Sequence, residues 1–567
     1  MEDSELQRLE GKLSEQTTEE QQDPKRGGWI TFPFIIGNLA GLSMASGGWG
    51  ANWIVFLITK FNIGSITATK INNVGFGFVN LFPIAGAIIA DSFFGNFIVI
   101  TISCFIALLG MMMLTIIAAM PSLRPSSPCL TCESPTKLQY LVLYLAMGLT
   151  SIGIGGSRFT IATFGADQLH KSQQQAAFFN WYFFVLYVAN AVSFIGIVYV
   201  EDNVGWGLGF GICLALTALG TAAFLLGSRF YRDVKPKGSP FTSIARVVVA
   251  AFRKRKISPP ANLGKAESYF YTTGTIKVVD SLPTKSFGFL NQAALKTEND
   301  RQPNGTYSKS WNISTVEEVE DLKTVIKIMP LWSAGILLSI TIAIFNSLST
   351  VQALAMNRHV GSIKIPAGTF LVFSLMSTAL SIFFIDRFFL PAWRKLTGRA
   401  LTHLQRVGIG HVINIVGLVG SALIETRRLH LVRTHGLANQ PGSVAPMSAL
   451  WLVSTLIIVG VGEGFQFPGM VGLYYQEFPE SLKSTSTAMI SLLIGLGYYL
   501  SAVATDIIDG TTGWLPDNIN QGRVDNVYWL CSVIGVVNFV YYLVCAKLYT
   551  YQRDANGDDG QPNSLIS

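Results

Sequence analysis

The chain has 567 residues, of which 50% are hydrophobic and only 13% are charged, and its formal net charge is +7. Ordinary soluble domains carry about 25% charged residues, so this composition excludes a soluble multidomain enzyme, a disordered chain and a fibrous repeat. It indicates a polytopic helical membrane protein, because a helix of about 20 apolar residues satisfies its own backbone hydrogen bonds inside lipid.

The first part of the chain, residues 1–28, is polar and rich in acidic residues. It lacks the apolar core of a signal peptide, so we expect a solvated and largely disordered tail. Twelve apolar segments follow, each long enough to suggest a membrane-spanning helix. Their approximate spans are 33–58, 71–91, 97–119, 138–162, 180–200, 206–228, 328–353, 367–386, 408–425, 447–475, 486–508 and 527–549.

Six of these segments precede a long polar stretch and six follow it, which predicts an all-α polytopic membrane protein with the 6+6 helices of the major facilitator fold. Such folds bind substrate near the bilayer midplane, between the two bundles. The ninth segment is short and the tenth is long, so we expect a tilt or a break there. The expected units are a tail at 1–28, a bundle at 29–228, a cytoplasmic loop at 229–324, a bundle at 325–550 and a tail at 551–567.

The loop 229–324 contains the whole excess of basic over acidic residues, as the positive-inside rule expects of a cytoplasmic loop; this pattern does not suggest nucleic-acid binding. Its start, 241–256, predicts a basic amphipathic helix on the inner membrane face, and the rest is expected to be a linker. An even number of helices places both termini on one side, and the basic loop 387–406 favours the cytoplasm. The basic residues of 426–446, among them Arg428, argue the opposite way.

The second segment ends in a glycine-rich turn with a carboxylate, Gly86-Ala-Ile-Ile-Ala-Asp91-Ser-Phe-Phe-Gly95-Asn96. This turn resembles the G-x-x-x-D-x-x-x-G-[RK] motif of major facilitator transporters, which implies a gating or structural role for Asp91 and Gly95. Asn96 replaces the usual cation of the motif, so the usual gating salt bridge is in doubt. The alternative is an ordinary turn that contains an aspartate.

Three further motifs follow in the fourth and fifth segments: Gly155-Gly156-Ser157-Arg158-Phe159, Phe164-Gly165-Ala166-Asp167-Gln168 and Phe178-Phe179-Asn180-Trp181. They resemble the signature of the proton-dependent oligopeptide transporter family, especially its plant nitrate/peptide branch. The usual patterns there are G-G-x-K-P, F-G-A-D-Q-F and F-F-N-W. The resemblance covers 30–550 and implies a transporter rather than an enzyme. It also implies structural roles for Gly165, Asp167, Gln168, Asn180 and Trp181.

Three departures from that family concern titratable groups. The family opens its first helix with E-x-x-E-[RK], a motif associated with proton coupling, whereas this chain has Leu39, Leu42 and Ser43 there. A midplane carboxylate can be neutralised by a proton, and its charge state can bias which side is open, but leucine cannot titrate. In the tenth segment Gly472 replaces a common glutamate. In the seventh segment, a relative has a histidine that is implicated in nitrate binding, and the position that aligns with it lies near Ile342 in this chain.

The remaining candidates for substrate binding are charged or polar residues inside the apolar segments. Arg158 stands at the family's lysine position, and its forked, permanently charged guanidinium suits a small planar oxyanion. Glu463 would pair with Arg158 or respond to substrate; for both residues the alternative is a structural ion pair. Tyr187, Asn346 and Gln352 would add polar lining, although such side chains between membrane helices more often serve packing. Asp506 and Asp509, near the end of the eleventh segment, are expected to be solvated.

Transport direction follows from the missing carboxylates. Moving one charge is worth roughly 2.3 kcal/mol per 100 mV, so concentrating an anion against an inside-negative potential requires accompanying protons. Without a proton carboxylate, an anion can still move outward along the voltage. The first segment, with Ser46-Gly-Gly-Trp49, also resembles the nitrate excretion subgroup, which implies a plasma-membrane carrier that releases nitrate and, in some members, chloride. We therefore predict passive, voltage-driven anion efflux.

Two other functions remain open. The chain would be a proton-coupled symporter of nitrate, peptides or another plant metabolite if Glu463 carried the proton. It would be a non-transporting sensor if the basic segment 246–256 and the acidic tail docked a regulatory kinase. No cofactor or metal site is expected, because the histidines show no ligand spacing and a lone pair of cysteines, Cys129 and Cys132, is weak support for one.

Overall fold

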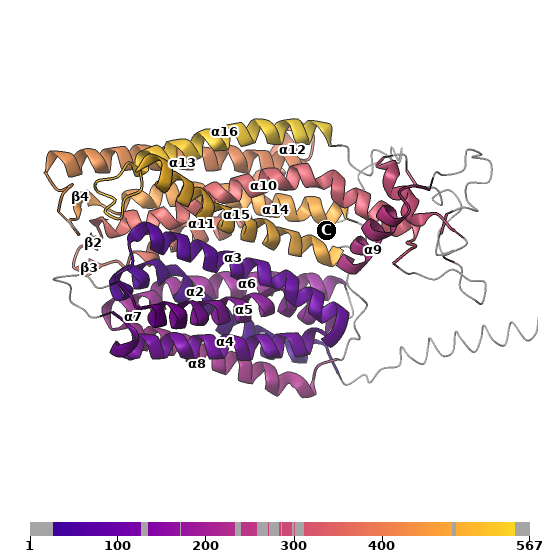
Figure 1. Cartoon of the computed structure of the whole chain (residues 1–567), viewed down its shortest axis with the longest axis horizontal. Helices are drawn as coiled ribbons and strands as arrows, with labels where there is room; N and C mark the ends of the chain where they lie inside the picture. Colours follow the sequence, from indigo (N-terminus) through magenta and orange to yellow (C-terminus); the bar gives the residue numbers. More distant parts are fainter. Residues whose placement is uncertain are drawn as a thin grey trace, which may run out of the picture.

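The computed structural model of the protein describes residues 26–125, 134–169, 172–232, 240–257, 270–271, 283–284, 286–297, 300, 311–440, 442–478 and 483–549. Within this part, twelve helices are long and apolar enough to cross a membrane. Figure 1 shows them as two adjacent bundles, with the N-terminal half in indigo to magenta and the C-terminal half in orange to yellow. The predicted all-α fold with six plus six helices is confirmed.

The N-terminal bundle contains the first six spanning helices. Its elements are α2 (Phe32–Phe61), α3 (Ser65–Ile89), α4 (Asn96–Ala119), α5 (Lys137–Asp167), α6 (Ser172–Val192) with its continuation α7 (Val198–Asn203), and α8 (Trp206–Leu226). A π-helical turn at Ser193–Ile197 joins α6 to α7, so these two elements form one span.

The C-terminal bundle contains the other six. Its elements are α10 (Val316–Leu354), α11 (Leu371–Phe384) with its continuation α12 (Leu390–Thr397), α13 (His403–Thr434), α14 (Trp451–Glu477), α15 (Lys483–Thr512) and α16 (Val524–Leu548). Four short strands lie in its loops: β1 (Met356–Asn357) pairs in parallel with β4 (Ala445–Ser448), and β2 (His359–Val360) pairs antiparallel with β3 (Ile363–Lys364).

Capping boxes fix where three of the spanning helices begin. In α5, α10 and α13 a threonine side chain accepts a hydrogen bond from the backbone N–H three residues later. The Gln or Glu side chain at that later position accepts a hydrogen bond from the backbone N–H of the threonine. The pairs are Thr136 with Gln139, Thr315 with Glu318, and Thr402 with Gln405. These bonds satisfy two of the N–H groups that a helix start otherwise leaves unpaired.

The ninth spanning helix is not short, contrary to the expectation from hydropathy. The expected span was 408–425, but α13 has 32 residues and ends at Thr434. The helix extends past Glu425 because this residue and Arg428 form a fully buried ion pair inside the bundle. Arg428 is therefore not a loop residue, and its charge no longer counts against a cytoplasmic location of the termini.

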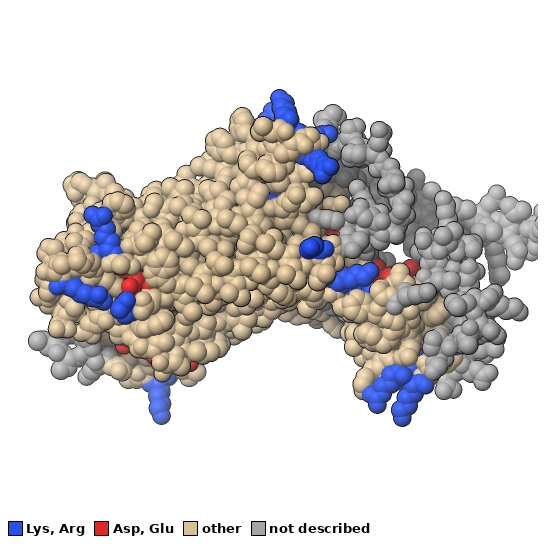
Figure 2. Space-filling model, turned by 90° about the horizontal axis from the view of Figure 1, so that it is seen from above, with Lys and Arg blue, Asp and Glu red and all other residues tan. Residues whose placement is uncertain are grey.

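The outer surface of the molecule has the charge distribution of a membrane protein. Figure 2 shows a broad, mostly uncharged middle, with most of the lysine and arginine side chains toward the two ends of the molecule. Large apolar side chains, among them Phe105, Leu219 and Val537, are more than half exposed on the helices. Such a belt is stable in lipid and unfavourable in water.

The polar stretch between the bundles is partly folded rather than a linker. The predicted amphipathic helix is present as α9 (Pro240–Arg253), which packs against a 3₁₀ helix at Gly288–Ala294 and the first turns of α10. Val247, Ala250 and Val319 are completely buried in this cluster. The seventh spanning helix begins at Val316, inside the expected loop 229–324.

Two basic residues of this region form ion pairs with the loop and with α10. The Arg246 guanidinium lies 3.2 Å from the Glu318 carboxylate, and Lys254 Nζ lies 2.6 Å from Asp300 Oδ2. Burial lowers the pKa of Lys254, and Asp300 opposes this shift. Val248 and Phe252, on another side of α9, are exposed.

Ion pairs join the two bundles at one end of the molecule, which we call the closed end. Lys70 Nζ on α3 lies 2.8 Å from Asp506 Oδ1 and 3.7 Å from Asp509 Oδ2 on α15. Asp202 on α7 lies 3.7 Å from the Arg358 guanidinium, which follows β1. The closed end is on the left in Figure 1, where α7, β2 and β3 lie. Asp506 is exposed, as expected, but both aspartates also pair with a lysine, which was not expected.

Candidate functional site

Four of the five side chains predicted to bind substrate meet between the bundles, together with one that sequence reasoning missed. Tyr187 on α6 interacts electrostatically with both Glu463 on α14 and Arg158 on α5. Tyr498 on α15 interacts with the same two charges and with the amide of Asn346 on α10. These five residues, Arg158, Tyr187, Asn346, Glu463 and Tyr498, are called the central cluster below.

Arg158 supplies the positive charge of the central cluster. Its backbone carbonyl accepts a 2.8 Å hydrogen bond from Tyr182 Oη, which fixes α5 against α6. Its guanidinium forms no ion pair or hydrogen bond with any residue that the structure describes, and the expected pairing with Glu463 is not present. A half-buried cation without a counter-ion inside a spanning helix is costly, and it attracts an anion.

The Glu463 carboxylate is held by its own bundle. Thr378 Oγ1 on α11 donates a hydrogen bond of 3.1 Å to Glu463 Oε2. The side chain is half-buried between the bundles. Asn346 is nearby, and its Oδ1 has no hydrogen-bond partner among the described residues. The cluster thus brings one cation, one carboxylate, two phenols and an amide close to one another.

Three layers of contacts block the path from the central cluster to the outside at the closed end. The first is aromatic: Phe76 stacks on Tyr498 with ring centroids 5.3 Å apart. The second is a hydrogen-bonded layer, in which Asn73 Nδ2 donates to Ser501 Oγ at 2.9 Å and Ser347 Oγ donates to Asn73 Oδ1 at 2.5 Å. The third is the ion pair of Lys70. Because each layer joins residues of both bundles, a substrate can leave through the closed end only if the bundles move apart there.

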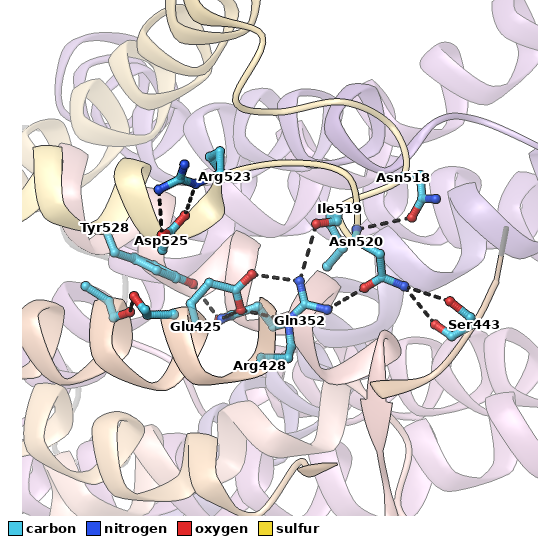
Figure 3. A network of polar contacts seen from close by, with 12 residues as sticks. Gln352, Glu425, Arg428, Ser443, Asn518, Ile519, Asn520, Arg523, Asp525 and Tyr528 are labelled. Atoms are coloured by element: carbon cyan, nitrogen blue, oxygen red, sulfur yellow. Dashed lines mark hydrogen bonds and ion pairs between the residues drawn. The ribbon is translucent and has the colours of Figure 1, made fainter. Parts of the chain in front are cut away.

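Gln352, the fifth predicted binding residue, lies elsewhere. Its side chain is 1% exposed, its Nε2 donates to Glu425 at 2.6 Å, and its Oε1 accepts from Tyr528 Oη at 2.7 Å. Figure 3 shows this network continuing through Arg428 to Asn520 and Ser443. Both ends of its amide are partnered inside the C-terminal bundle, and these contacts favour a structural role over the predicted binding role.

The two leucines that replace the family's helix-1 carboxylates are core residues. Leu39 is 2% exposed and Leu42 is 4% exposed, and both belong to the apolar core of the N-terminal bundle. The space left by the glutamate replaced at Gly472 is filled by a ring: a Cβ on Gly472 would lie 2.3 Å from Cε1 of His403. The space around all three positions is therefore filled, and none of them is an empty cavity that could hold a carboxylate side chain.

This contact predicts that restoring the family's carboxylate would damage the protein. Gly472→Glu should destabilise the purified protein by about 1–3 kcal/mol, because the new side chain meets the His403 ring. The loss should appear as a lower midpoint of thermal unfolding in detergent. The double variant Gly472→Glu, His403→Ala should recover most of it, whereas an equally low midpoint in the double variant would contradict this packing argument.

The turn motif after α3 combines a π-helical turn with a glycine of positive φ. Asp91 lies in a π-helical turn at Ala90–Phe94, and its side chain is outside the described residues. Gly95 follows with φ 77°, a conformation that favours glycine. Asn96, at the position of the missing cation, donates to Asp167 Oδ2 at 3.4 Å, so an amide joins the turn to the end of α5.

The other signature residues tie the same end of the N-terminal bundle together. A Cβ on Gly165 would lie 2.1 Å from the Phe178 ring, so only glycine allows this approach of α5 to α6. The completely buried Gln168 accepts from the Arg232 N–H at 2.7 Å and donates to the Arg232 carbonyl at 3.3 Å. Trp181 is 51% exposed and packs edge-on against Phe32. These contacts support structural roles.

Several predictions fall outside the described residues. They concern the acidic tail up to residue 25, the tail 551–567, Cys129 and Cys132, and the side chain of Asn180. Among the residues that are described, no group of three His, Cys, Asp or Glu side chains is placed to hold a metal ion.

Comparison with known proteins identifies the family. The PTR2 profile, described as the POT family, matches residues 97–520. Protein NRT1/ PTR FAMILY 2.7 of Arabidopsis thaliana is 48% identical over 547 residues, covering 95% of this chain and 96% of that protein. Protein NRT1/ PTR FAMILY 2.6 of the same plant is 48% identical over 543 residues, covering 95% of each chain.

Solved structures agree on the fold. An auto-inhibited POT family peptide transporter superposes with a TM-score of 0.69 at 17% identity, covering 94% of this chain and 99% of that one. The POT family transporter PepTSo superposes with a TM-score of 0.67, also at 17% identity, covering 94% of this chain and 99% of that one. The chain is therefore a multi-pass membrane transporter of the major facilitator fold, and it belongs to the POT family, within the plant nitrate/peptide transporter branch.

Proposed function

We propose that the protein mediates passive, voltage-driven efflux of nitrate across the plasma membrane. The observation that carries this proposal is the Arg158 guanidinium, which lies between the two bundles without a counter-ion among the described residues. An anion in the central cluster would supply the missing negative charge. Nitrate suits this site because its planar oxygens match the planar fork of guanidinium donors. Chloride offers charge without that geometry.

The composition of the first helix supports the direction. Leu39 and Leu42 are packed in the core and cannot exchange protons. A bound anion that crosses without protons carries its full charge, and roughly 2.3 kcal/mol per 100 mV then drives it out of an inside-negative compartment. This driving force corresponds to a concentration ratio of about fifty-fold. Efflux therefore needs no further energy source.

The proposal further orients the molecule with both termini in the cytoplasm. The basic loop after α11 and the basic residues near α9 support this orientation under the positive-inside rule. The closed end then faces outward, and nitrate would reach the central cluster from the cytoplasm. Exit requires the three layers between Phe76 and Lys70 to separate.

A flux measurement tests the proposal. Purified protein in proteoliposomes should release nitrate faster when the imposed potential favours anion exit, and a pH gradient alone should drive none. Chloride and a dipeptide, measured in parallel at equal concentration, define selectivity; nitrate should move faster than chloride, and the dipeptide should not move. Nitrate movement that follows a pH gradient and ignores voltage would overturn the proposal.

The second candidate, proton-coupled symport, is favoured by one observation. Glu463 is a carboxyl group inside the central cluster, within electrostatic range of the same tyrosines as Arg158. If Glu463 carried a proton with each anion, Glu463→Gln would abolish uphill uptake driven by a pH gradient. The same substitution would leave downhill, voltage-driven efflux active if the first proposal holds.

A further inference from the structure

A buried carboxyl group lies in the N-terminal bundle, outside the central cluster. Glu201 on α7 is 1% exposed, and its Oε2 accepts a 3.1 Å hydrogen bond from Asn52 Nδ2 on α2. A Cβ on Gly209 of α8 would lie 2.2 Å from Glu201 Cγ, so the side chain is packed tightly between three helical segments. None of the described lysines, arginines or histidines forms an ion pair with it.

Two atoms of this contact have no partner among the described residues. They are Glu201 Oε1 and Asn52 Oδ1, both buried and both acceptors. An unpaired buried polar atom costs about 1–3 kcal/mol, and an unpaired buried charge costs more. A carboxylic acid and an amide can share two hydrogen bonds, acid O–H to amide oxygen and amide N–H to acid oxygen. An ionised carboxylate keeps only the second of these.

We propose that Glu201 and Asn52 form a proton-binding site that controls the closed end. Adding one proton from water to Glu201 Oε1 removes the buried charge and creates the donor that the contact lacks. The family's titratable carboxylates stand in the first helix at the positions of Leu39 and Leu42. The structure instead brings a carboxyl group from the fifth spanning segment to the same first helix, later along the helix at Asn52.

The site adjoins one of the ion pairs that close the molecule. Asp202, the next residue, lies 3.7 Å from the Arg358 guanidinium of the other bundle. Burial lowers the pKa of Arg358, and Asp202 raises it, so the arginine depends on this partner. The other titratable groups nearby are Asp202 itself and Cys213 on α8, both of which interact electrostatically with Glu201.

The direction of the effect follows from linkage. In the closed conformation Glu201 is buried, and this environment favours the protonated acid. Its partner Asn52 packs against Gly368 of the C-terminal half, so separation of the bundles at this end uncovers the Asn52–Glu201 contact, and water there favours the ionised carboxylate. A proton therefore binds the closed conformation more tightly and shifts the population toward it. A low pH on this side of the membrane should therefore keep the closed end closed, and a high pH should allow it to open.

Infrared difference spectroscopy on the purified full-length protein tests proton binding. Glu463→Gln removes the carboxyl group of the central cluster, so this variant is used as the background. Raising the pH should remove a carboxylic-acid carbonyl band, and the band should be lost when Glu201→Gln is added. The absence of any titrating carboxylic-acid band in the Glu463→Gln protein would overturn the proposal even if the Glu201→Gln protein did not fold.

Opening of the closed end is measured as the distance between two spin labels. Val204 follows Asp202 by two residues and Ile363 follows Arg358 by five, and their side chains are 66% and 61% exposed. Val204→Cys and Ile363→Cys therefore place one label on each bundle, near the Asp202–Arg358 pair. Cys129 and Cys132 are replaced by serine. In reconstituted protein without substrate, the distance between the labels should lengthen from acidic to alkaline pH, and Glu201→Gln should remove this response by holding the short distance throughout.

Asp202→Asn is the matched control for this measurement. It weakens the ion pair, so the closed end should open more often at every pH, but the response to pH should persist because Glu201 is intact. A Glu201→Gln protein that responds to pH like the parent, or an Asp202→Asn protein that loses the response, would show that another group senses the proton. Neither readout depends on nitrate flux, so the outcome is independent of the proposed function.

Discussion

Arg158→Ala should lower nitrate efflux strongly at nitrate concentrations below half-saturation, while the protein remains folded and in the membrane. The guanidinium is the positive charge of the central cluster, and with none of the described residues does it form an ion pair whose loss would destabilise the fold. A hydrogen bond to a charged group contributes about 1.5–3 kcal/mol, and every 1.4 kcal/mol is a factor of ten. The concentration of nitrate that gives half-maximal flux should therefore rise by roughly tenfold to a hundredfold.

Two further variants separate charge, geometry and nonspecific effects. Arg158→Lys keeps the charge but loses the planar fork, so its flux should be intermediate for nitrate and closer to the parent for chloride. Arg387→Ala removes one exposed cation after α11, remote in sequence from the cluster, and its flux should equal that of the parent. If Arg158→Ala transported nitrate with unchanged half-saturation, Arg158 would not belong to the binding site.

Arg428→Met should cause the largest loss of stability. Arg428 and Glu425 are completely buried, with Nη2 of the arginine 2.7 Å from Oε1 of the glutamate. Removing one partner leaves a buried charge uncompensated, which costs about 3–5 kcal/mol. The network in Figure 3 would also lose the contacts of Arg428 with Asn520 and the Ile519 carbonyl, which join α13 to the chain between α15 and α16.

The matched control adds a second substitution to the first. In Arg428→Met, Glu425→Gln the remaining partner is neutral, so most of the lost stability should return, and Gln352 keeps a polar neighbour. Both variants are compared by the midpoint of thermal unfolding of the purified protein. A double variant as unstable as Arg428→Met alone would mean that packing, and not the uncompensated charge, sets the cost.

The candidate site was only partly predictable. Arg158, Asn346 and Glu463 could be selected because polar or charged side chains inside apolar segments are costly and therefore rare, and Tyr187 because it stands three residues before Asn190 on the same side of its helix. Tyr498 escaped notice because a tyrosine is ordinary in such a segment. Gln352 was selected by the same reasoning and yet belongs to a buried network with Glu425, because a sequence does not reveal which polar groups satisfy each other.

The sequence by itself determined the number and approximate position of the spanning helices, because the bilayer forces each one to be long, apolar and internally hydrogen-bonded. It also determined family membership through local motifs such as Gly165 to Gln168. Only the tertiary structure decided which residues pair across the molecule: Lys70 with Asp506, Asn52 with Glu201 and Gln352 with Glu425. These partners are far apart in the chain, and their burial depends on how the helices pack, so no local pattern encodes them.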